Sequence, residues 1–243
     1  MKFIQIIPTY NEILNLPILV EALFTLAIPG LNVLVVDDHS PDGTGQLADD
    51  LSQLYSGRLS VLHREGKAGL GRAYVHGFRH ALDQDADVVG MMDADLSHPP
   101  DRLPVMMAAL KDADVVIGSR YVAGGGVDKT WPFWRKGLSW FGNAYARAIL
   151  GLPINDATGG YRLWRRSALE YIPFEQALSN GYIFQVELAY LATLAGLTFR
   201  EVPIYFKERT QGDSKMSLRI QFEAAFRVWQ LRRLHHHKRF EQK

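Results

Sequence analysis

The sequence predicts an α/β protein in which helices flank a mostly parallel central sheet. Through the first half of the chain, short apolar segments alternate with longer segments whose apolar residues recur at helical spacing. The short segments are almost continuously apolar, as expected for parallel strands that are buried on both faces. The 243 residues are enough to bury a full core, and no linker or internal repeat interrupts them. We therefore expect one domain that spans residues 1–243.

The expected strands are short runs rich in Val, Ile, Leu and Met. In chain order, they are Phe3–Ile7, Val33–Val36, Leu59–Leu62, Val88–Met92 and Val115–Ile117. The expected helices lie between successive strands, and each has apolar residues at helical spacing. In chain order, they are Asn15–Leu26, Thr44–Tyr55, Leu70–Leu82 and Arg102–Leu110. This alternation indicates βαβ units, which build a parallel sheet because each helix carries the chain back to the edge where the next strand starts.

The second half of the chain differs in composition. Two Phe and three Trp residues gather in Trp131–Phe141, interleaved with basic side chains. They form either part of the core or a surface that lies in a bilayer interface. Beyond them, we expect an apolar helix over Tyr182–Leu197, a strand over Phe199–Phe206 and an amphipathic helix over Leu218–Leu234.

Composition and charge exclude several classes of function. The formal net charge is +1, so bulk electrostatics do not indicate a nucleic-acid partner. The chain has no cysteine, which rules out disulfides, thiol catalysis and cysteine-ligated zinc. Polar residues and prolines interrupt the longest apolar region, Ile13–Val36, so it does not predict a transmembrane helix. No signal peptide is expected, because the first strand begins almost at the N-terminus.

Polar clusters follow three of the expected strands at the point where each strand ends. These clusters are Pro8–Glu12, Asp37–Thr44 and Asp93–Asp95. In open parallel sheets, ligands bind beyond the carboxyl ends of the strands. We therefore expect the three clusters to contribute to one ligand site.

The acidic pair of Asp93 and Asp95 is the most informative of these clusters. Two carboxylates at i and i+2 at the end of an extended strand point to the same side. A cation between them relieves their repulsion, and their hard oxygen ligands suit Mg²⁺ or Mn²⁺, which commonly bridge to substrate phosphates. The pair therefore indicates a phosphate-bearing donor held through a divalent ion. Taken alone, two solvated loop aspartates are the simpler interpretation.

Two further segments are typical of nucleotide or phosphate sites. Asp38 ends the second strand, where a carboxylate can accept a hydrogen bond from a base N–H or a ribose hydroxyl. The glycine-rich loop 64–71 opens a helix, and a helix N-terminus with Lys67 nearby suits phosphate. The loop is not a dinucleotide fingerprint, because Tyr74 stands at the third glycine position, and it is not a Walker loop either. Helix packing explains its glycines about as well as a ligand does.

A series of motifs occurs along almost the whole chain. In the first half, they are residues 7–12 (IPTYNE), 36–44 (VDDHSPDGT), 66–71 (GKAGLG) and 92–99 (MDADLSHP). In the second half, they are residues 118–121 (GSRY), 156–162 (DATGGYR) and 209–217 (RTQGDSKMS). Together they resemble the motifs of family-2 glycosyltransferases with the GT-A fold, and more narrowly those of dolichyl- or polyprenyl-phosphate mannosyltransferases. The resemblance implies a Rossmann-like sheet followed by C-terminal amphipathic helices. Residues 1–120 would form a nucleotide-sugar-binding half, residues 121–217 an acceptor half, and residues 218–243 an amphipathic helix with a basic tail.

The resemblance implies roles for the residues of a donor site. The nucleotide-sugar-binding residues would be Pro8, Tyr10, Glu12, Asp38, Lys67, Gly69 and Ala94. The metal, Mg²⁺ or Mn²⁺, would be bound by Asp93, Asp95 and Ser97, and some relatives have Gln at the position of this serine. Asp156 is expected to position the sugar or the acceptor, because an ionised phosphate nucleophile has no proton for a base to remove.

The resemblance also implies a cationic acceptor site, since an anionic acceptor that meets an anionic donor needs positive charge to hold the two in line. The implied acceptor-phosphate residues are Arg120, Arg135, Ser139, Arg209 and Lys215. The implied catalytic residues are Asp93, Asp95, Arg120 and Arg209.

The reaction implied is the metal-dependent, inverting transfer of mannose from GDP-mannose to a polyprenyl (dolichyl-type) phosphate. An enzyme of this kind is expected in the cytoplasm, peripherally associated with the cytoplasmic face of a membrane, and a separate membrane-anchoring protein is left open as a further partner. Two alternatives also stay open. One is transfer from UDP-glucose or another UDP-sugar to the same class of lipid. The other is an inactive nucleotide-sugar-binding subunit of a membrane complex.

Overall fold

The structure is a computed structural model, and it describes residues 1–179, 181–208 and 218–235. Strands and helices alternate through the first half of the chain. They are β1 (Phe3–Thr9), α1 (Leu16–Thr25), β2 (Leu31–Asp37), α2 (Thr44–Leu54), β3 (Leu59–His63), α3 (Leu70–Asp83) and β4 (Val88–Met91). Each of these elements lies where the sequence pattern predicts it, with ends that differ by one or two residues.

The second half begins with three short helices or helical turns and a strand. They are η1 (Pro100–Arg102), α4 (Leu103–Ala109), η2 (Leu110–Asp112) and β5 (Val115–Ser119). The remaining elements are β6 (Gly126–Val127), α5 (Phe133–Leu150), β7 (Arg162–Arg165), α6 (Arg166–Tyr171), η3 (Phe174–Gln176), α7 (Tyr182–Leu194), β8 (Phe199–Pro203), β9 (Tyr205–Phe206) and α8 (Leu218–His235).

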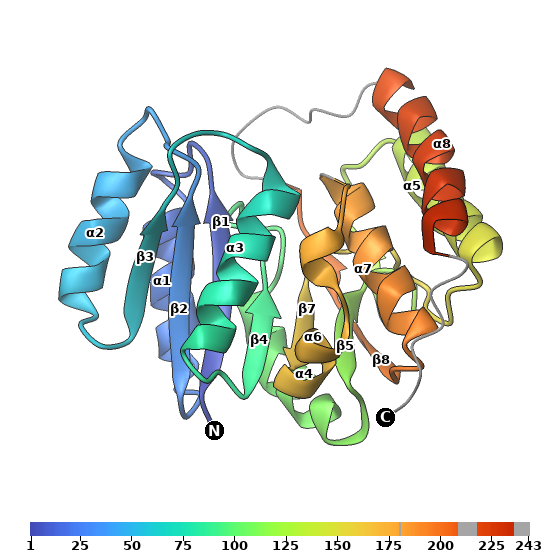
Figure 1. Ribbon diagram of the computed structural model, residues 1–243. Coiled ribbons are helices and arrows are strands. Elements are labelled where there is room, and N and C mark those ends of the chain that lie inside the picture. The colour runs from blue at the N-terminus through green and yellow to red at the C-terminus, as the bar shows by residue number, and fades with distance from the viewer. Residues whose placement is uncertain (180, 209–217, 236–243) are drawn as a thin grey trace.

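Seven of the strands form one central sheet in the order β3-β2-β1-β4-β7-β5-β8, and β6 pairs with β9 in a small second sheet. Helices cover both faces of the central sheet (Figure 1). All of its pairings are parallel except the two made by β7. The predicted α/β fold with a mostly parallel sheet is therefore confirmed.

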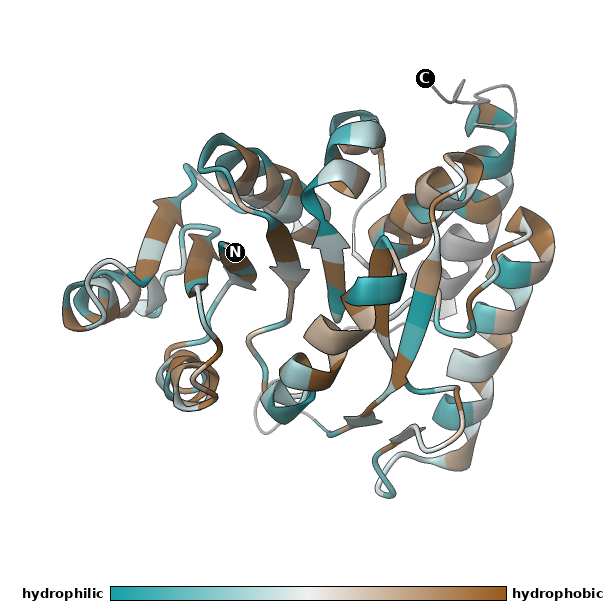
Figure 2. Ribbon diagram, turned by 90° about the horizontal axis from the view of Figure 1, so that it is seen from below, coloured by the Kyte–Doolittle hydropathy of each residue, from teal (hydrophilic) through white to brown (hydrophobic). Residues whose placement is uncertain are grey.

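The two faces of the sheet bury two separate hydrophobic cores. Along β1, Ile4 and Ile6 face the core beneath α3, α6 and α7, whereas Phe3 and Ile7 face the core beneath α1, α2 and α4. This alternation follows from the two-residue repeat of a strand, and burial on both sides explains why the strand segments are so apolar. Figure 2 shows hydrophobic residues on most of the strands and a mixture of hydrophobic and hydrophilic residues along the helices.

The antiparallel strand β7 is the feature of the fold that matters most for the site. It lies between β4 and β5 and runs against both of them, with Met91 and Ile117 each paired to Arg162. Because β7 runs the other way, its first residue lies at the edge where β4 and β5 end. The loop that precedes β7, residues 155–161, is therefore placed beside the carboxyl ends of the parallel strands.

Two expectations about local structure need correction. The acidic pair Asp93–Asp95 does not continue a strand, because β4 ends at Met91 and the chain then bends, with Leu96 in the left-handed region at φ +62°. The expected strand Phe199–Phe206 is two strands, β8 and β9. At residue 204 the chain passes from the central sheet to the second one, because its N–H donates to the carbonyl of Ser119 on β5 whereas its carbonyl accepts from the N–H of Gly126 on β6. The aromatic segment, for which the sequence predicted no element, is mostly helical, since α5 begins at Phe133.

The helices α5 and α8 lie side by side at one end of the molecule (Figure 1). The indole N–H of Trp229 donates to the hydroxyl of Tyr145 at 2.9 Å, which joins the two helices. At the end of α8, the buried side chain of His235 lies 3.1 Å from Glu187 on α7. These contacts fix the described part of α8 against the body of the protein.

Candidate functional site

The ends of β1 and β2 are held together by a buried aspartate. Both carboxylate oxygens of Asp37 accept hydrogen bonds, from the hydroxyls of Thr9 (2.9 Å) and Ser40 (2.6 Å) and from the backbone N–H of Ser40 (3.0 Å). Asp37 is 2 % exposed, so these bonds satisfy a carboxylate that lies in the interior. Asp37 therefore shapes the loop after β2.

The neighbouring Asp38 has a different environment. Its carboxylate forms a buried ion pair with Arg64, which follows β3. Arg64 was not singled out from the sequence, because the two residues are 26 positions apart and only the parallel pairing of β2 with β3 brings them together. Among the described residues, Nε of Arg64 has no hydrogen-bond partner. The pair gives the β2 end one acceptor group and one cationic donor group in a largely desolvated position.

The other predicted donor residues surround this pair on adjacent loops. Tyr10 lies under the ammonium group of Lys67, which is 3.6 Å from the ring centroid. The backbone N–H of Glu12 donates to the hydroxyl of Thr44 at 2.9 Å, which connects the β1 loop to the start of α2. The remaining members of the predicted set lie at corresponding places, with Pro8 near the end of β1 and Gly69 directly before α3 at φ +93°. The structure thus brings the predicted nucleotide-binding residues of β1, β2 and the glycine-rich loop to one edge of the sheet.

The turn after β4 carries the acidic pair. Oδ1 of Asp95 accepts hydrogen bonds from the hydroxyl of Ser97 (2.5 Å) and from its backbone N–H (3.1 Å). Ser97 is fully buried, and its side chain caps Asp95 rather than projecting from the turn. The sequence predicts Ser97 as a metal ligand, and its observed contact is with the neighbouring carboxylate.

The buried side chain of His98 stabilises the same turn. Its Nδ1 accepts a hydrogen bond from the backbone N–H of Asp93 at 3.0 Å. Its ring stacks on Tyr161 at 5.2 Å between centroids and meets the edge of Phe206 at 5.5 Å. Because Nδ1 is engaged and the ring is 1 % exposed, His98 positions Asp93 in this structure.

The hydroxyl of Tyr74 lies 3.4 Å from Oδ1 of Asp93. Burial raises the pKa of Tyr74 well above its usual range, and the negative charge of Asp93 raises it further. The phenol therefore stays protonated at neutral pH and can donate to the carboxylate. This residue came to notice in the sequence only because it breaks a glycine motif, and its contact with Asp93 depends on how α3 packs against β4.

The acidic turn fits a divalent ion that a substrate helps to bind. Among the described residues, no group of three His, Cys, Asp or Glu side chains is placed to hold a metal ion. The carboxylates of Asp93 and Asp95 supply hard oxygen donors, as Mg²⁺ and Mn²⁺ require. An ion at this turn would complete its coordination with phosphate oxygens and water, which is typical of Mg²⁺ at phosphate-transfer sites.

Arg120, which directly follows β5, is held by Asp156. Three groups of Arg120 donate to this carboxylate: the backbone N–H (3.0 Å), Nε (2.7 Å) and Nη2 (2.6 Å). Nη2 also donates to the hydroxyl of Thr158 at 2.8 Å, and the backbone N–H of Gly159 donates to Asp156 at 2.9 Å. Asp156 is fully buried and the Arg120 side chain is 9 % exposed. The loop before β7 therefore fixes the orientation of the guanidinium.

Charge and burial act against each other in this pair. Burial raises the pKa of Asp156, but the charge of Arg120 and its hydrogen bonds outweigh that effect and hold the pKa below the usual range. For Arg120, burial lowers the pKa and Asp156 raises it, with a net upward shift. Both groups are therefore charged at neutral pH. A carboxylate with a lowered pKa and engaged oxygens is a poor general base.

Phe206 joins the predicted acceptor residues. The guanidinium of Arg120 lies 5.3 Å from its ring centroid, and the ring of Trp131 meets its ring edge at 5.9 Å. Arg135 stacks on Trp131 at 3.7 Å and forms an ion pair with Glu208 at 2.9 Å. Phe206 was not singled out from the sequence, because an isolated aromatic in a strand usually indicates core packing. In the structure Phe206 contacts Arg120 directly and is connected to Arg135 through Trp131.

Ser139 belongs to the same region. Its hydroxyl accepts a hydrogen bond from the phenol of Tyr121 at 2.7 Å, and the Tyr121 ring lies 5.3 Å from the Arg120 guanidinium. Three of the five predicted acceptor residues, Arg120, Arg135 and Ser139, thus come together. Arg209 and Lys215 lie outside the described residues.

The acceptor cluster and the acidic turn are neighbours. The backbone N–H of Lys207 donates to the carbonyl of Ser97 at 3.3 Å, which connects the end of β9 to the turn. His98 touches Phe206, over which Arg120 lies. His98 and Phe206 therefore connect the acidic turn to the cluster that contains Arg120, and the two groups lie next to each other.

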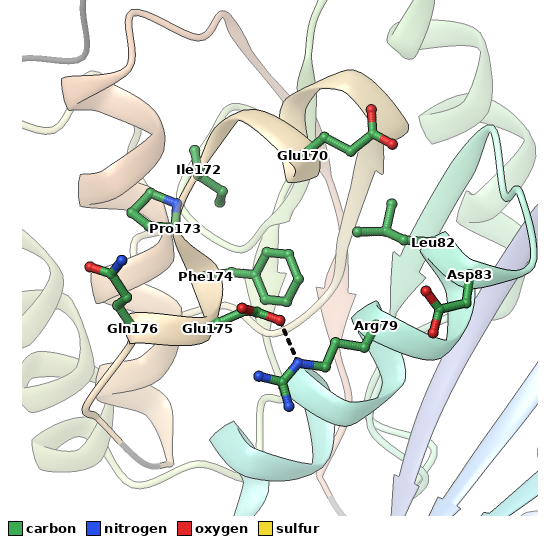
Figure 3. Close-up of a pocket in the computed structure, with 9 residues that line it drawn as sticks. All are labelled: Arg79, Leu82, Asp83, Glu170, Ile172, Pro173, Phe174, Glu175 and Gln176. Carbon is green, nitrogen blue, oxygen red and sulfur yellow. Dashed lines mark hydrogen bonds and ion pairs between the residues drawn. The ribbon is translucent and has the colours of Figure 1, made fainter.

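A separate pocket, drawn in Figure 3, lies between the last part of α3 and the segment after α6. An ion pair of 2.5 Å between Arg79 and Glu175 spans it. Since α3 begins at the carboxyl edge of the sheet, its last residues lie toward the opposite edge. This pocket contains none of the residues predicted for the donor, the metal or the acceptor.

The aromatic segment splits into a buried and an exposed part. Trp131 is 7 % exposed and packs beneath Arg135. The other four, Phe133, Trp134, Trp140 and Phe141, are between 59 % and 88 % exposed. Their spacing of one and seven residues places them on one stripe of α5, which faces away from the core. In the part of the chain that the structure describes, no helix has both the length and the apolar character of a membrane-spanning segment.

Comparisons with known proteins cover almost the whole chain. The family described as "Glycosyl transferase family 2" matches residues 5–172. The chain is 47 % identical over 228 residues to the "Undecaprenyl-phosphate mannosyltransferase" of Micrococcus luteus, which covers 94 % of this chain and 93 % of that protein. It is 48 % identical over 234 residues to the "Polyprenol monophosphomannose synthase" of Mycolicibacterium smegmatis, and this alignment covers 95 % of this chain and 88 % of that protein.

Solved structures show the same fold at lower identity. A glucosyl-3-phosphoglycerate synthase from Mycobacterium tuberculosis, in complex with Mn²⁺, UDP and glucosyl-3-phosphoglycerate, matches with a TM-score of 0.64 and 18 % identity over 95 % of this chain and 78 % of that one. The same enzyme in complex with Mn²⁺, UDP-glucose and glycerol 3-phosphate matches equally well, with a TM-score of 0.64.

Proposed function

The chain belongs to glycosyl transferase family 2, and we propose that it transfers a mannosyl group from GDP-mannose to a polyprenyl phosphate. The names of the two bacterial relatives support the mannosyl group and the polyprenyl acceptor, because they match nearly the whole chain at almost half of its positions. The resemblance to polyprenyl-phosphate mannosyltransferases implies GDP-mannose as the nucleotide-activated form of mannose.

One structural observation carries the proposal. The acidic turn Asp93–Ser97 is connected to the cationic group of Arg120 and Arg135 through the contact of His98 with Phe206. This arrangement suits transfer between two phosphate-bearing substrates, because a metal can hold one anion while cationic side chains hold the other.

The donor half would bind the nucleotide at the edge formed by β1, β2 and β3. Asp38 offers an acceptor for a base N–H or a ribose hydroxyl, and Arg64 holds it in place. Lys67, stacked on Tyr10, places a positive charge within the glycine-rich loop, just before the N-terminus of α3, where phosphate is favoured.

Asp93 and Asp95 would hold Mg²⁺ or Mn²⁺, which neutralises the charge that develops on the departing nucleoside diphosphate. The protein contributes a preorganised turn to this step. Ser97 fixes the orientation of Asp95, and Nδ1 of His98 fixes the backbone at Asp93. Both supports are buried, so the carboxylates need little rearrangement when the donor arrives.

The acceptor half would orient a nucleophile that is already ionised. A phosphate monoester carries at least one negative charge at neutral pH, so its oxygen can attack without a general base. Arg120 and Arg135 would bind this phosphate and aim it at the anomeric carbon. We assign Asp156 to positioning Arg120, because its carboxylate is occupied by that guanidinium.

The exposed aromatic stripe of α5 would bring the enzyme to its lipid substrate. Phe133 and Trp134 lie at the start of α5, one turn before Gly137, and Trp140 and Phe141 follow on the same stripe. Contiguous exposed aromatics of this kind mark an interaction surface, and Trp in particular favours the membrane interface. We propose that this stripe contacts the bilayer in which the polyprenyl chain is embedded.

The test is a transfer assay with two donors in parallel. The purified protein is given a short polyprenyl phosphate with GDP-mannose or with UDP-glucose, in the presence of Mg²⁺, Mn²⁺ or EDTA, and release of the nucleoside diphosphate is measured. We expect lipid-dependent release of GDP that EDTA abolishes, and little release of UDP.

Two results would contradict the proposal. Release of UDP from UDP-glucose without release of GDP would assign the donor to the other sugar nucleotide. Tight binding of GDP-mannose without turnover would favour a nucleotide-sugar-binding subunit that is inactive. An Asp95→Asn variant is expected to lose transfer, whereas an Asp85→Asn variant on the exposed surface serves as the matched control.

A further inference from the structure

Gln185 is a buried amide without a hydrogen-bonding partner in the described part of the protein. It lies on α7 and is 1 % exposed. Among the described residues, neither Oε1 nor Nε2 of its side chain has a hydrogen-bond partner. Buried polar atoms in proteins are nearly always hydrogen-bonded, and an amide that lacks both bonds destabilises the fold. A ligand that supplies a donor and an acceptor would account for its presence.

The amide faces a small gap next to the acidic turn. A Cβ atom placed on Gly160 would lie 3.5 Å from Nε2 of Gln185, 3.5 Å from Cε1 of His98 and 3.6 Å from Oδ1 of Asp93. One point in space is therefore in van der Waals contact with the amide, with the histidine that supports the turn and with a carboxylate of the acidic pair. Because residue 160 is glycine, the protein leaves this point free of a side chain.

Both sides of the gap are held rigidly by Arg162. Its guanidinium is fully buried and donates to three carbonyl oxygens, those of Gly159 (2.9 Å), Gln185 (2.8 Å) and Ala157 (2.7 Å). These bonds tie the loop before β7 to α7 at the residue that carries the amide. The separation between the Gly160 backbone and Gln185 is thus fixed by the fold and does not depend on a mobile surface segment.

We propose that the Gln185 amide binds a hydroxyl group of the transferred sugar and helps to select it. This inference rests on the proposed function, in which the donor diphosphate lies at Asp93 and the sugar next to it. A neutral amide suits a hydroxyl, because each can donate and accept a hydrogen bond. The acceptor phosphate is better matched by the arginines on the other side of the turn.

The test compares the wild type with Gln185→Leu, which has a similar volume and no polar atoms. Affinities for GDP and for GDP-mannose are measured by calorimetry, kcat/KM by transfer to a short polyprenyl phosphate, and stability by the thermal midpoint Tm. Gln53→Leu, on the exposed surface of α2, is the matched control.

We expect Gln185→Leu to lower kcat/KM for GDP-mannose by about 10- to 100-fold, because its site loses a hydrogen bond to the sugar. The affinity for GDP should stay within about twofold. Tm should be equal or higher, because the substitution removes an unsatisfied buried group. A purely structural role predicts the opposite pattern, with a lower Tm and an equal loss of affinity for GDP and GDP-mannose.

Deoxy analogues of GDP-mannose identify the hydroxyl. For the analogue that lacks the bound hydroxyl, wild type and Gln185→Leu should give the same kcat/KM, whereas the other analogues should keep the difference. An equal effect on every analogue, or no effect on GDP-mannose, would overturn the inference.

Gly160→Ala tests the gap independently of the amide. The added methyl would make only ordinary contacts and Gly160 has no left-handed backbone, so Tm should not fall. Because the methyl fills the gap, kcat/KM for GDP-mannose should fall by about tenfold or more, with GDP affinity retained. Unchanged kcat/KM would show that no substrate group enters the gap.

These measurements also separate the inference from the proposed function. If the wild type uses UDP-glucose instead of GDP-mannose, the donor proposal fails, and the same comparison is made with UDP, UDP-glucose and its deoxy analogues. If the wild type turns over neither donor, calorimetry still compares its affinity for each sugar nucleotide with its affinity for the corresponding nucleoside diphosphate. In that case, loss of the sugar's contribution to affinity in Gln185→Leu supports the inference, and its retention overturns it.

Discussion

Replacement of Asp156 by Asn tests the ion pair that orients Arg120. The carboxylate accepts four hydrogen bonds, three from Arg120 and one from the backbone of Gly159, and both side chains are almost completely buried. An asparagine side chain has the same shape, but only one of its two terminal groups is an acceptor. Its NH2 group would therefore face N–H donors of Arg120 or Gly159 and form no hydrogen bond with them. The variant also leaves a buried guanidinium without a counter-charge.

We expect this change to lower the free energy of unfolding by about 3–5 kcal/mol, as is typical when one partner of a buried ion pair is removed. For a chain of this size, that loss corresponds to a fall in Tm of roughly 10 °C. The matched control is Asp85→Asn, which breaks an Arg–Asp pair whose aspartate is 88 % exposed and should cost at most about 1 kcal/mol. Urea denaturation measures both values, and equal losses in the two variants would refute the assignment.

The pH dependence of this difference follows from the pKa of Asp156. Its pKa is lower in the folded protein than in the unfolded chain, so the ion pair contributes stability that is fully present above the unfolded pKa and is lost as the pH falls through the folded pKa. The gap in unfolding free energy between wild type and Asp156→Asn should therefore be constant above about pH 5 and narrow below about pH 4. A gap that widens in acid would contradict the assigned direction.

The same variant separates positioning from base catalysis. If Asp156 positions Arg120, Asp156→Asn should raise KM for the lipid phosphate by about tenfold and leave the shape of the kcat–pH profile unchanged. If Asp156 were a general base, kcat would fall by about 10²- to 10⁴-fold and its acid limb would disappear. Steady-state kinetics between pH 5 and 9 distinguish the two results.

Three further outcomes are expected. Asp38→Asn should weaken GDP binding by about tenfold in calorimetry and leave KM for the lipid phosphate unchanged, and an effect on the lipid alone would contradict the nucleotide role. His98→Ala should raise the Mn²⁺ concentration for half-maximal activity by about tenfold, because the backbone N–H of Asp93 loses its hydrogen bond to Nδ1 of His98. An unchanged concentration would exclude this role of His98. The double change Phe133→Ser and Trp134→Ser should lower binding to phosphatidylcholine vesicles by about tenfold in a sedimentation assay, whereas activity toward a short acceptor should be retained. Vesicle binding equal to that of the wild type would exclude a membrane role for this stripe.

Much of the fold was predictable from local sequence, because its first half follows simple repeats. Phe3–Ile7 and Val33–Val36 are apolar enough to be strands buried on both faces, and both are. The antiparallel β7 was not predictable in this way. Its sequence, Arg162–Arg165, has a charged residue at each end, and Arg162 is buried because three backbone carbonyls accept its hydrogen bonds, two in the loop before β7 and one on α7.

The candidate site was predictable to the extent that its residues belong to local motifs at strand ends. Asp38, Asp93 and Arg120 each follow a strand of the sheet, so their convergence follows from the topology. Phe206 could not be found in this way, because its role depends on partners that are far away in the chain. Arg64 also follows a strand, but its ion pair with Asp38, 26 positions earlier, is evident only in the folded structure. The same holds for Gln185 and Gly160, where the informative features are an unsatisfied amide and a gap that only the packed structure shows.

The central claim is that the acidic turn binds the donor through a metal, whereas the arginines bind the acceptor phosphate. It is tested most directly by measuring the binding of each substrate in one variant of each group. Kd for GDP with Mn²⁺ and KM for a polyprenyl phosphate are measured for Asp95→Asn and for Arg135→Met, with Arg79→Met in an exposed ion pair as the control. We predict that Asp95→Asn weakens GDP binding at least tenfold, and that Arg135→Met raises KM for the lipid phosphate about tenfold while Kd for GDP is unchanged. A loss of GDP affinity in Arg135→Met as large as that in Asp95→Asn would contradict this division.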